Sequence, residues 1–208
     1  MKKRNPYDIL LATELDEKSD ERFDVHKYAD MHIENHSLQL DLQVEFNGCV
    51  FERCRFIGDF RKAQFIDCVM NRCDLSNADF TSSRFHRVNL SSCKGMGTHF
   101  TKAKWQYVTI TDSILNYGEF ADVDFQDIIL LKSDLSQSSF FTANLQRISL
   151  KQVVLAQTDF SDTPLNGLDF SLCEIDGIRV SPSCMKGLSV NTNQAIALIG
   201  LFGVKVNE

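Results

Sequence analysis

The chain has 208 residues, a formal net charge of −6 and a sequence pI of about 5.4. This acidic balance disfavours direct binding to nucleic acid, and no apolar stretch has the length of a signal peptide or a membrane span, so we expect a cytoplasmic protein without membrane contact. Seven cysteines, an odd number without a CxxC pair, favour reduced thiols over a disulfide framework.

The first 43 residues follow no repeat and combine acidic residues with scattered apolar ones. We expect residues 1–43 to form a capping arm, a short helix or an irregular segment that packs over the domain after it. His32 and His36 are four residues apart, a spacing that would let them share a metal ion on a helix. No third ligand is close in sequence, so exposed histidines are the favoured interpretation and no metal site is predicted.

A five-residue repeat begins after this arm. From Phe60 to Met185 every fifth residue is large and apolar, with Gly95 as the one exception among 26 positions. The spacing extends upstream to Phe46, across a single four-residue step between Phe56 and Phe60. Neither a helix, with a period of 3.6, nor a strand, with a period of 2, produces it. Two residues before each centre stands a small or β-branched residue, so each unit has two inward positions and a mostly polar outer surface.

The stretch CDLSNADFTSSRFHRVNL, residues 73–90, resembles the A(D/N)LXX consensus of pentapeptide-repeat proteins, and the resemblance covers roughly Val44 to Met185. It implies an all-β solenoid, a right-handed quadrilateral β-helix with four units per coil, over residues 44–187. About seven coils at ~4.8 Å each would form a rod roughly 34 Å long. Every fourth centre should then stack, which predicts a phenylalanine column (Phe60, Phe80, Phe100, Phe120, Phe140, Phe160) and an aliphatic column (Leu75, Gly95, Leu115, Leu135, Leu155, Ile175).

The repeat leaves little room for catalysis. Cys54, Cys73 and Cys93 fall in one inward column, and Cys49 and Cys68 in the next, where we expect them to fill small buried slots rather than bind zinc. No phosphate-binding loop, nucleophile elbow or metalloprotease helix occurs in the sequence. We therefore expect a protein that is not an enzyme and needs no cofactor.

Charge is distributed unevenly along the repeat. Residues 44–104 contain ten Lys and Arg against six Asp and Glu, a net of +4, whereas residues 105–190 contain five against eleven, a net of −6. The acids gather on the predicted phenylalanine side and its corner. Charge alone favours a solvated face, since any rod of Asp-rich repeats shows acids, but a stiff rod with acids along one side also resembles a nucleic-acid duplex that a protein partner could recognise. The candidate partner-binding residues are Asp79, Glu119, Asp122, Asp124, Asp127, Asp159 and Asp162.

The tail 188–208 predicts a helix with its N-cap at Asn191 or Thr192. Its apolar residues spread over more than one stripe, so one side should cover the last coil and the other a second copy of the chain. The candidate dimerisation residues are Ala195, Ile196, Leu198, Ile199, Leu201 and Phe202.

This tail, GLSVNTNQAIALIGLFGVKV, also resembles the C-terminal segment of Qnr-type fluoroquinolone-resistance proteins, in particular those of Gram-positive bacteria. Gln194, Ala195, Gly203 and Val204 match that pattern. The resemblance implies a homodimer that binds DNA gyrase, topoisomerase IV or both and protects them from fluoroquinolones. The loops that interrupt the coils of Gram-negative members are missing here. The alternative is a repeat scaffold that binds another protein and has no quinolone-related role.

Overall fold

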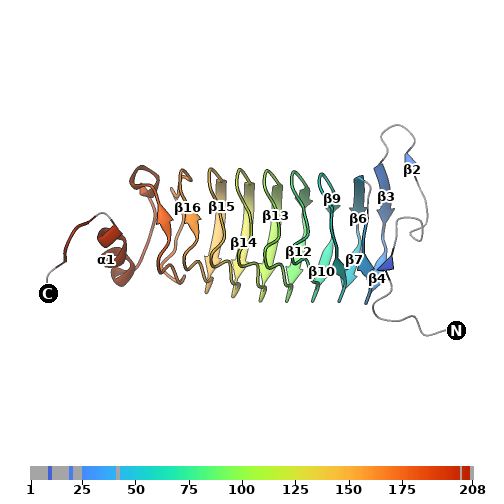
Figure 1. Ribbon diagram of the computed structural model, residues 1–208, viewed down its shortest axis with the longest axis horizontal. Helices are drawn as coiled ribbons and strands as arrows, with labels where there is room; N and C mark the ends of the chain where they lie inside the picture. Colours follow the sequence, from blue (N-terminus) through green and yellow to red (C-terminus); the bar gives the residue numbers. More distant parts are fainter. Residues whose placement is uncertain (1–8, 11–18, 21–24, 41–42, 202, 207–208) are drawn as a thin grey trace.

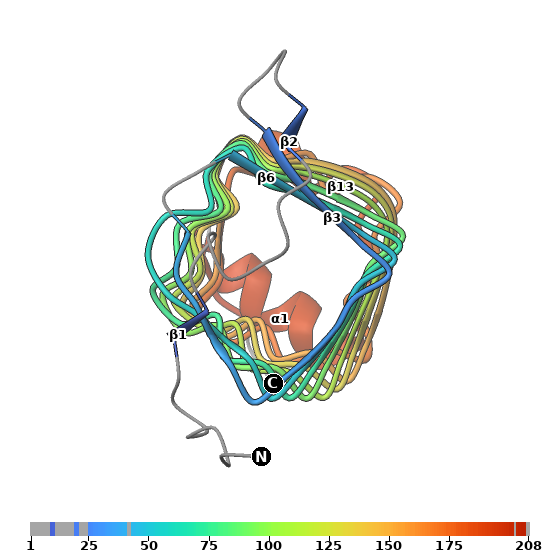
Figure 2. The same cartoon turned by 90° about the vertical axis from the view of Figure 1, so that its right-hand side faces the viewer.

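The computed structural model describes residues 9–10, 19–20, 25–40, 43–201 and 203–206. They form a stack of short strands that winds into a solenoid of about eight turns and ends in one short helix (Figure 1). Viewed along the stack, the coil is four-sided (Figure 2), so the predicted right-handed quadrilateral β-helix is confirmed. No helix within these ranges is both long enough and apolar enough to cross a membrane.

The strands are β1 (Ile9–Leu10), β2 (Ser19–Asp20), β3 (Val25–Ala29), β4 (His32–Glu34), β5 (Ser37–Leu38), β6 (Gln43–Asn47), β7 (Val50–Glu52), β8 (Arg55–Phe56), β9 (Gln64–Ile66), β10 (Val69–Asn71), β11 (Arg84–His86), β12 (Asn89–Ser91), β13 (Lys104–Thr111), β14 (Asp124–Leu131), β15 (Asn144–Lys151), β16 (Asp159–Phe160) and β17 (Arg179–Val180). A 3-10 turn, η2 (Pro182–Met185), precedes the helix α1 (Thr192–Leu201).

Strands of successive coils pair in parallel, so each residue faces its equivalent one coil further along. Lys104 of β13 faces Asp124 of β14, which in turn faces Asn144 of β15. The four-residue step predicted from the sequence shortens one coil, because Phe46 of β6 faces Phe65 of β9, whereas Phe65 itself faces Phe85 of β11. The side-chain columns therefore stay aligned across the step.

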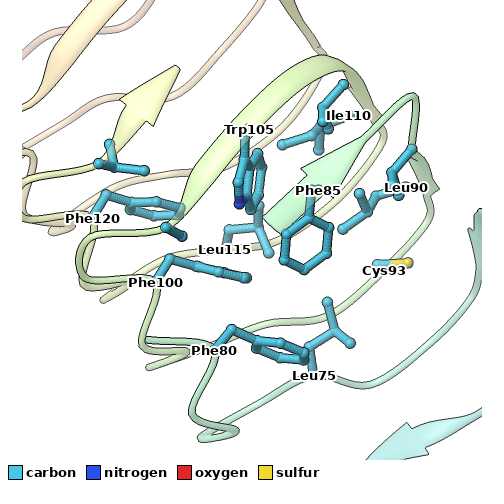
Figure 3. Packing of buried hydrophobic residues seen from close by; sticks show 14 of the residues in the cluster. Leu75, Phe80, Phe85, Leu90, Cys93, Phe100, Trp105, Ile110, Leu115 and Phe120 are labelled. Atoms are coloured by element: carbon cyan, nitrogen blue, oxygen red, sulfur yellow. The ribbon is translucent and has the colours of Figure 1, made fainter. Parts of the chain in front are cut away.

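The predicted phenylalanine column is present and buried. Neighbouring rings from Phe60 to Phe160 stack with centroids 5.2, 5.3, 5.2, 4.7 and 5.3 Å apart, and Figure 3 shows part of this column. A second aromatic column, which the sequence analysis did not identify, runs beside it on the next side. It consists of Tyr28, Phe46, Phe65, Phe85, Trp105 and Phe125, with centroids 4.8 to 5.5 Å apart.

The coils start earlier than predicted, and the boundary at residue 44 is wrong. Strands β3, β4 and β5 pair in parallel with β6, β7 and β8, so residues 25–40 belong to a further coil rather than to an arm. Its buried centres Tyr28, Ile33 and Leu38 also recur at every fifth position. Counting back from Phe46 in steps of five misses them, because this coil is shorter than the others and brings Tyr28 opposite Phe46. Residues 1–8, 11–18, 21–24 and 41–42 of the predicted arm lie outside the described residues.

The ladder of strands is interrupted after β15. No backbone hydrogen bond joins residues 144–151 to residues 164–171 of the following coil, all of which the structure describes. Residues 164–171 pair instead with the coil after them, for example through the bridge between Asp169 and Ser189. The inward residues Leu145, Ile148 and Leu150 are consequently only half-buried. On the other two sides the same two coils remain joined by backbone hydrogen bonds. For example, the Leu155 N–H donates to the Glu174 carbonyl at 2.7 Å.

Candidate protein-binding surfaces

Aspartate recurs directly before the apolar centres because its carboxylate closes a turn. The Oδ1 atoms of Asp74, Asp79 and Asp134 accept hydrogen bonds from the backbone N–H two residues later, at 3.0, 2.9 and 2.8 Å. Aspartate favours such turns for this reason. Acidity at this position therefore has a structural explanation, and a contact surface must be argued from the charges that remain unpaired.

Three of the seven predicted partner-binding acids share one column. Parallel bridges join the outward positions in the order Asp79, His99, Glu119, Ser139, Asp159. We call this series the acid column. Glu119 lacks the Asx turn of its two aspartates, so its charge has no such local structural role.

The other four predicted acids continue around the corner onto the next side. Asp122 and Asp162 adopt the left-handed conformation with φ of 55°, which aspartate tolerates better than most residues. Lys62, Lys102 and Thr142 take the same conformation at equivalent positions, so the turn does not require an acid. Asp124 begins β14, and Asp127 stands within that strand with φ of 58°. The predicted set thus extends past the predicted side and its corner onto the next side, in β14.

Two of the seven carboxylates are neutralised by arginine. Asp127 Oδ1 accepts a hydrogen bond from Arg147 Nε at 2.6 Å, and this partner lowers the pKa of the carboxyl. Asp159 pairs with Arg179 at 3.0 Å. Partial burial opposes ionisation there, but hydrogen bonds from Ser161 and the charge of Arg179 outweigh it and lower the pKa of Asp159.

The remaining acids have no close cationic partner among the described residues. Arg61 Nε lies 3.8 Å from Asp79, a loose contact. Within the described residues no ion pair forms at Glu119, Asp122, Asp124 or Asp162, although Asn144 donates a hydrogen bond to Asp124 at 2.8 Å. These four carboxylates form the uncompensated part of the predicted surface.

Helix α1 lies across the far end of the stack (Figure 2), and its Gln194 bonds to the last coil. Asn191 and Gln194 form a reciprocal cap: Asn191 Oδ1 accepts from the Gln194 N–H at 3.0 Å, and Gln194 Oε1 accepts from the Asn191 N–H at 2.8 Å. Gln194 Nε2 also donates to the carbonyls of Phe170 and Cys173 at 2.9 and 2.7 Å. The predicted cap at Asn191 is confirmed.

Replacing Gln194 by alanine should therefore destabilise the protein by about 1–3 kcal/mol, because two carbonyls at the end of the stack lose their donor and the cap is broken. Chemical denaturation measures the change. Asn193→Ala, at the exposed neighbouring position, is the control and should have little effect. An equal loss from both variants would contradict the capping role.

The opposite side of α1 is apolar and exposed. Ile196, Ile199 and Leu201 are 46%, 42% and 52% exposed. Leu198 is buried against the last coil, so its place among the predicted dimerisation residues is corrected: the side chain stabilises the cap within one chain. Ala195 is half-buried, and Phe202 lies outside the described residues.

The cysteines fill the inward slots, as predicted. Cys54, Cys73 and Cys93 are buried, and their thiols donate to carbonyls of the preceding coil at 3.2 to 3.4 Å. Hydrogen bonds to Cys54 and Cys93, together with burial, raise the pKa of Cys73 and keep that thiol protonated. His32 lies in a strand, so the helical spacing to His36 does not apply. Among the described residues, no three His, Cys, Asp or Glu side chains converge as metal ligands.

Several apolar residues that are not among the predicted site residues are exposed on the rod. Met96, Ile114 and Tyr117 occupy outward positions that are polar in most repeats, and all three are about half exposed. The register that identifies the core already marks these positions as outward. Apolar residues at outward positions are therefore the feature of the sequence that indicates this exposed surface.

Family models match the chain over its central part. The pentapeptide repeat region matches residues 44–120, and the model of eight pentapeptide-repeat copies matches residues 119–155. No curated protein matches the sequence.

Solved structures share the fold at low identity. QnrB1, a plasmid-mediated fluoroquinolone resistance protein, is 19% identical with a TM-score of 0.52, and the alignment covers 95% of this chain and 99% of QnrB1. HetL, from the cyanobacterium Nostoc sp. strain PCC 7120, is involved in heterocyst differentiation regulation; it is 13% identical with a TM-score of 0.40 over 90% of each chain. The five-residue register, the stacked coils and the two matching models all agree: this chain belongs to the pentapeptide-repeat family, and its fold is that of QnrB1.

Proposed function

We propose that this protein binds a type II topoisomerase, DNA gyrase or topoisomerase IV, in place of a DNA duplex and thereby protects the enzyme from fluoroquinolones. The proposal assigns it a role in binding, not in catalysis, in the cytoplasm. The observation that carries it is a rod whose C-terminal half displays carboxylates without cationic partners: Glu119, Asp122, Asp124 and Asp162. The QnrB1 fold, shared along nearly the whole chain, supports the same proposal.

A duplex presents regularly spaced negative charges along a stiff axis, and a protein that grips it does so with basic side chains. Successive coils repeat their outward positions at about 4.8 Å, so the acid column and its corner place carboxylates at regular levels along the rod. Complementary charge of this kind speeds association and fixes orientation. The Glu119 and Asp122 carboxylates are the central members of the surface.

The proposed active form is a homodimer joined through the exposed side of α1. Ile196, Ile199 and Leu201 would be shielded from water by the same residues of a second copy. Because residues 105–190 carry a net charge of −6 and residues 44–104 a net charge of +4, such a dimer has its acidic segments at the centre and its basic segments at the tips. A two-fold basic saddle in the topoisomerase complements this arrangement in sign and in symmetry.

The direct test is DNA supercoiling by gyrase in the presence of a fluoroquinolone. Adding this protein should restore supercoiling over a range of concentrations below those that inhibit the enzyme directly. A failure to restore supercoiling at every such concentration, for gyrase and for topoisomerase IV alike, would contradict the proposal.

Charge-neutral variants test the surface. Combining Glu119→Gln, Asp122→Asn and Asp162→Asn should weaken topoisomerase binding by about tenfold or more, since unpaired charges at an interface contribute to both association rate and affinity. Asparagine tolerates the left-handed corner conformation, so the fold is retained. The matched control neutralises three exposed acids on other sides, Asp112→Asn, Glu174→Gln and Asp176→Asn. An equal loss of topoisomerase binding from the two sets would mean that the acid column and its corner are not the contact surface.

The alternative is a repeat scaffold for another protein partner. It is favoured by one observation: aspartates such as Asp74 and Asp134 serve turns, so part of the acidity follows from the repeat itself. Capture of a partner other than a topoisomerase from a bacterial lysate, with no restored supercoiling, would support this alternative.

A further inference from the structure

Three exposed apolar side chains lie on the side of the rod that adjoins the acid column. Met96, Ile114 and Tyr117 are 50%, 44% and 48% exposed. Met96 and Ile114 come from adjacent coils, and Tyr117 stands at the corner that ends this side. We call these three residues the apolar patch.

Backbone pairing fixes their relative positions. Ile114 lies between Lys94 and Asp134 in its column. The Gly97 N–H donates to the Asn116 carbonyl at 3.0 Å, which places Tyr117 one coil beyond Gly97 in the corner column. Glycine adds no side chain there, and the Asn77 carboxamide lies over it, with Oδ1 2.8 Å from the position that a Gly97 Cβ would take. On the other side of Tyr117 a shallow groove continues along the corner, lined by Tyr117, Gln137, Gln157, Gly177 and Arg179.

The patch ends beside an unpaired carboxylate. Glu119 follows Tyr117 by two residues, is exposed, and belongs to the acid column. At the far end of the groove Arg179 is already paired with Asp159 at 3.0 Å. The free negative charge closest in sequence to the aromatic ring is therefore that of Glu119.

We propose that the apolar patch and Glu119 together bind an arginine side chain of the protein partner. An arginine has an aliphatic stem that packs on apolar residues, a planar guanidinium that stacks on an aromatic ring, and a donor fork that fits a carboxylate. Met96 and Ile114 supply the apolar surface, Tyr117 the ring and Glu119 the carboxylate. This inference rests on the proposed binding of a basic protein partner, and it adds the residue type that the site selects.

Arginine accounts for the whole arrangement better than lysine does. A lysine ammonium is compact and strongly hydrated. It would form an ion pair with Glu119 but would interact less favourably with the Tyr117 ring than a guanidinium does. A surface that only attracted positive charge would need no exposed Met96, Ile114 or Tyr117. Tyr117 is thus assigned as a specificity-determining residue, which separates arginine-bearing partners from lysine-rich polycations.

Peptides test the arginine site without a topoisomerase. The full chain is titrated with the capped peptide Gly-Arg-Gly-Arg-Gly and with its lysine counterpart, and the ring resonances of Tyr117 and Tyr107 are followed by NMR. The arginine peptide should shift the Tyr117 resonances several-fold more than the lysine peptide and leave those of Tyr107 unchanged. Equal shifts from both peptides, or none at Tyr117, would overturn the inference.

Variants test the same site in the complex. Tyr117→Asn should lower topoisomerase affinity about tenfold, the range of a cation–π contact in a partly desolvated site. Tyr107→Asn is matched in exposure and in backbone conformation, with φ of 57° against 58°, and should have no effect. Equal affinity of the two variants would overturn the inference. If wild-type protein binds no topoisomerase, the proposed function fails while the peptide titration still decides the arginine site.

Discussion

Replacing Phe120 by alanine should lower the free energy of unfolding by about 3–5 kcal/mol. The side chain is 0% exposed, and its ring stacks on Phe100 and Phe140 with centroids 5.2 and 4.7 Å away. The coils above and below are tied by backbone hydrogen bonds, so they cannot close around the vacated space, and the cavity adds to the lost burial. Urea denaturation followed by circular dichroism measures the change.

The neighbouring aromatic residue provides the control. Phe141 is 44% exposed and sits one residue after Phe140 on the outside of the next coil, so Phe141→Ala should change stability by less than about 1 kcal/mol. The two variants remove the same atoms, one set from the core and the other from the surface. Similar losses from both would show that the inward and outward assignments are wrong.

The combined variant Ile199→Asp with Leu201→Asp should convert a dimer into a monomer. Both side chains are exposed on α1 in the single chain, and a carboxylate buried there without a partner would be strongly destabilising for the dimer. Light scattering should give about twice 23.7 kDa for the wild type and about 23.7 kDa for the variant.

Asn193→Asp, at an exposed position in the first turn of the same helix, should leave the dimer intact. Leu198 is unsuitable for this experiment because it stabilises the cap within one chain. A wild type that is monomeric at all concentrations would contradict the dimer.

The sequence predicts most of this fold because one rule, a large apolar residue every fifth position, determines the direction of nearly every side chain. The Phe60–Phe160 column, the buried cysteines and the shortened coil at Phe56 all follow from it. The first coil was missed for a physical reason. It is shorter than the coils after it, so stepping back by five from Phe46 reaches Met31 and His36 instead of its true centres, Ile33 and Leu38.

The candidate surfaces were less predictable. The sequence locates Asp127 and Asp159 but not the arginines that neutralise them, since Arg147 and Arg179 each lie on the following coil and their side chains could point either way along the rod. The tail predicts a helix with two apolar sides, but only contacts show that Leu198 faces the coil. Charge patterns do not predict a role for Tyr117, because its side chain is uncharged.

The interrupted ladder after β15 affects the mechanics of the rod. Along most of its length every coil is bonded to the next on all four sides, which resists bending. Between residues 144–151 and 164–171 two adjacent sides lack these bonds while the other two keep them, so the bonded sides form a hinge line and the opposite sides can open. In a dimer joined through α1, one such hinge would flank the junction on each side, and the long body would bend near its centre to follow the curvature of its partner.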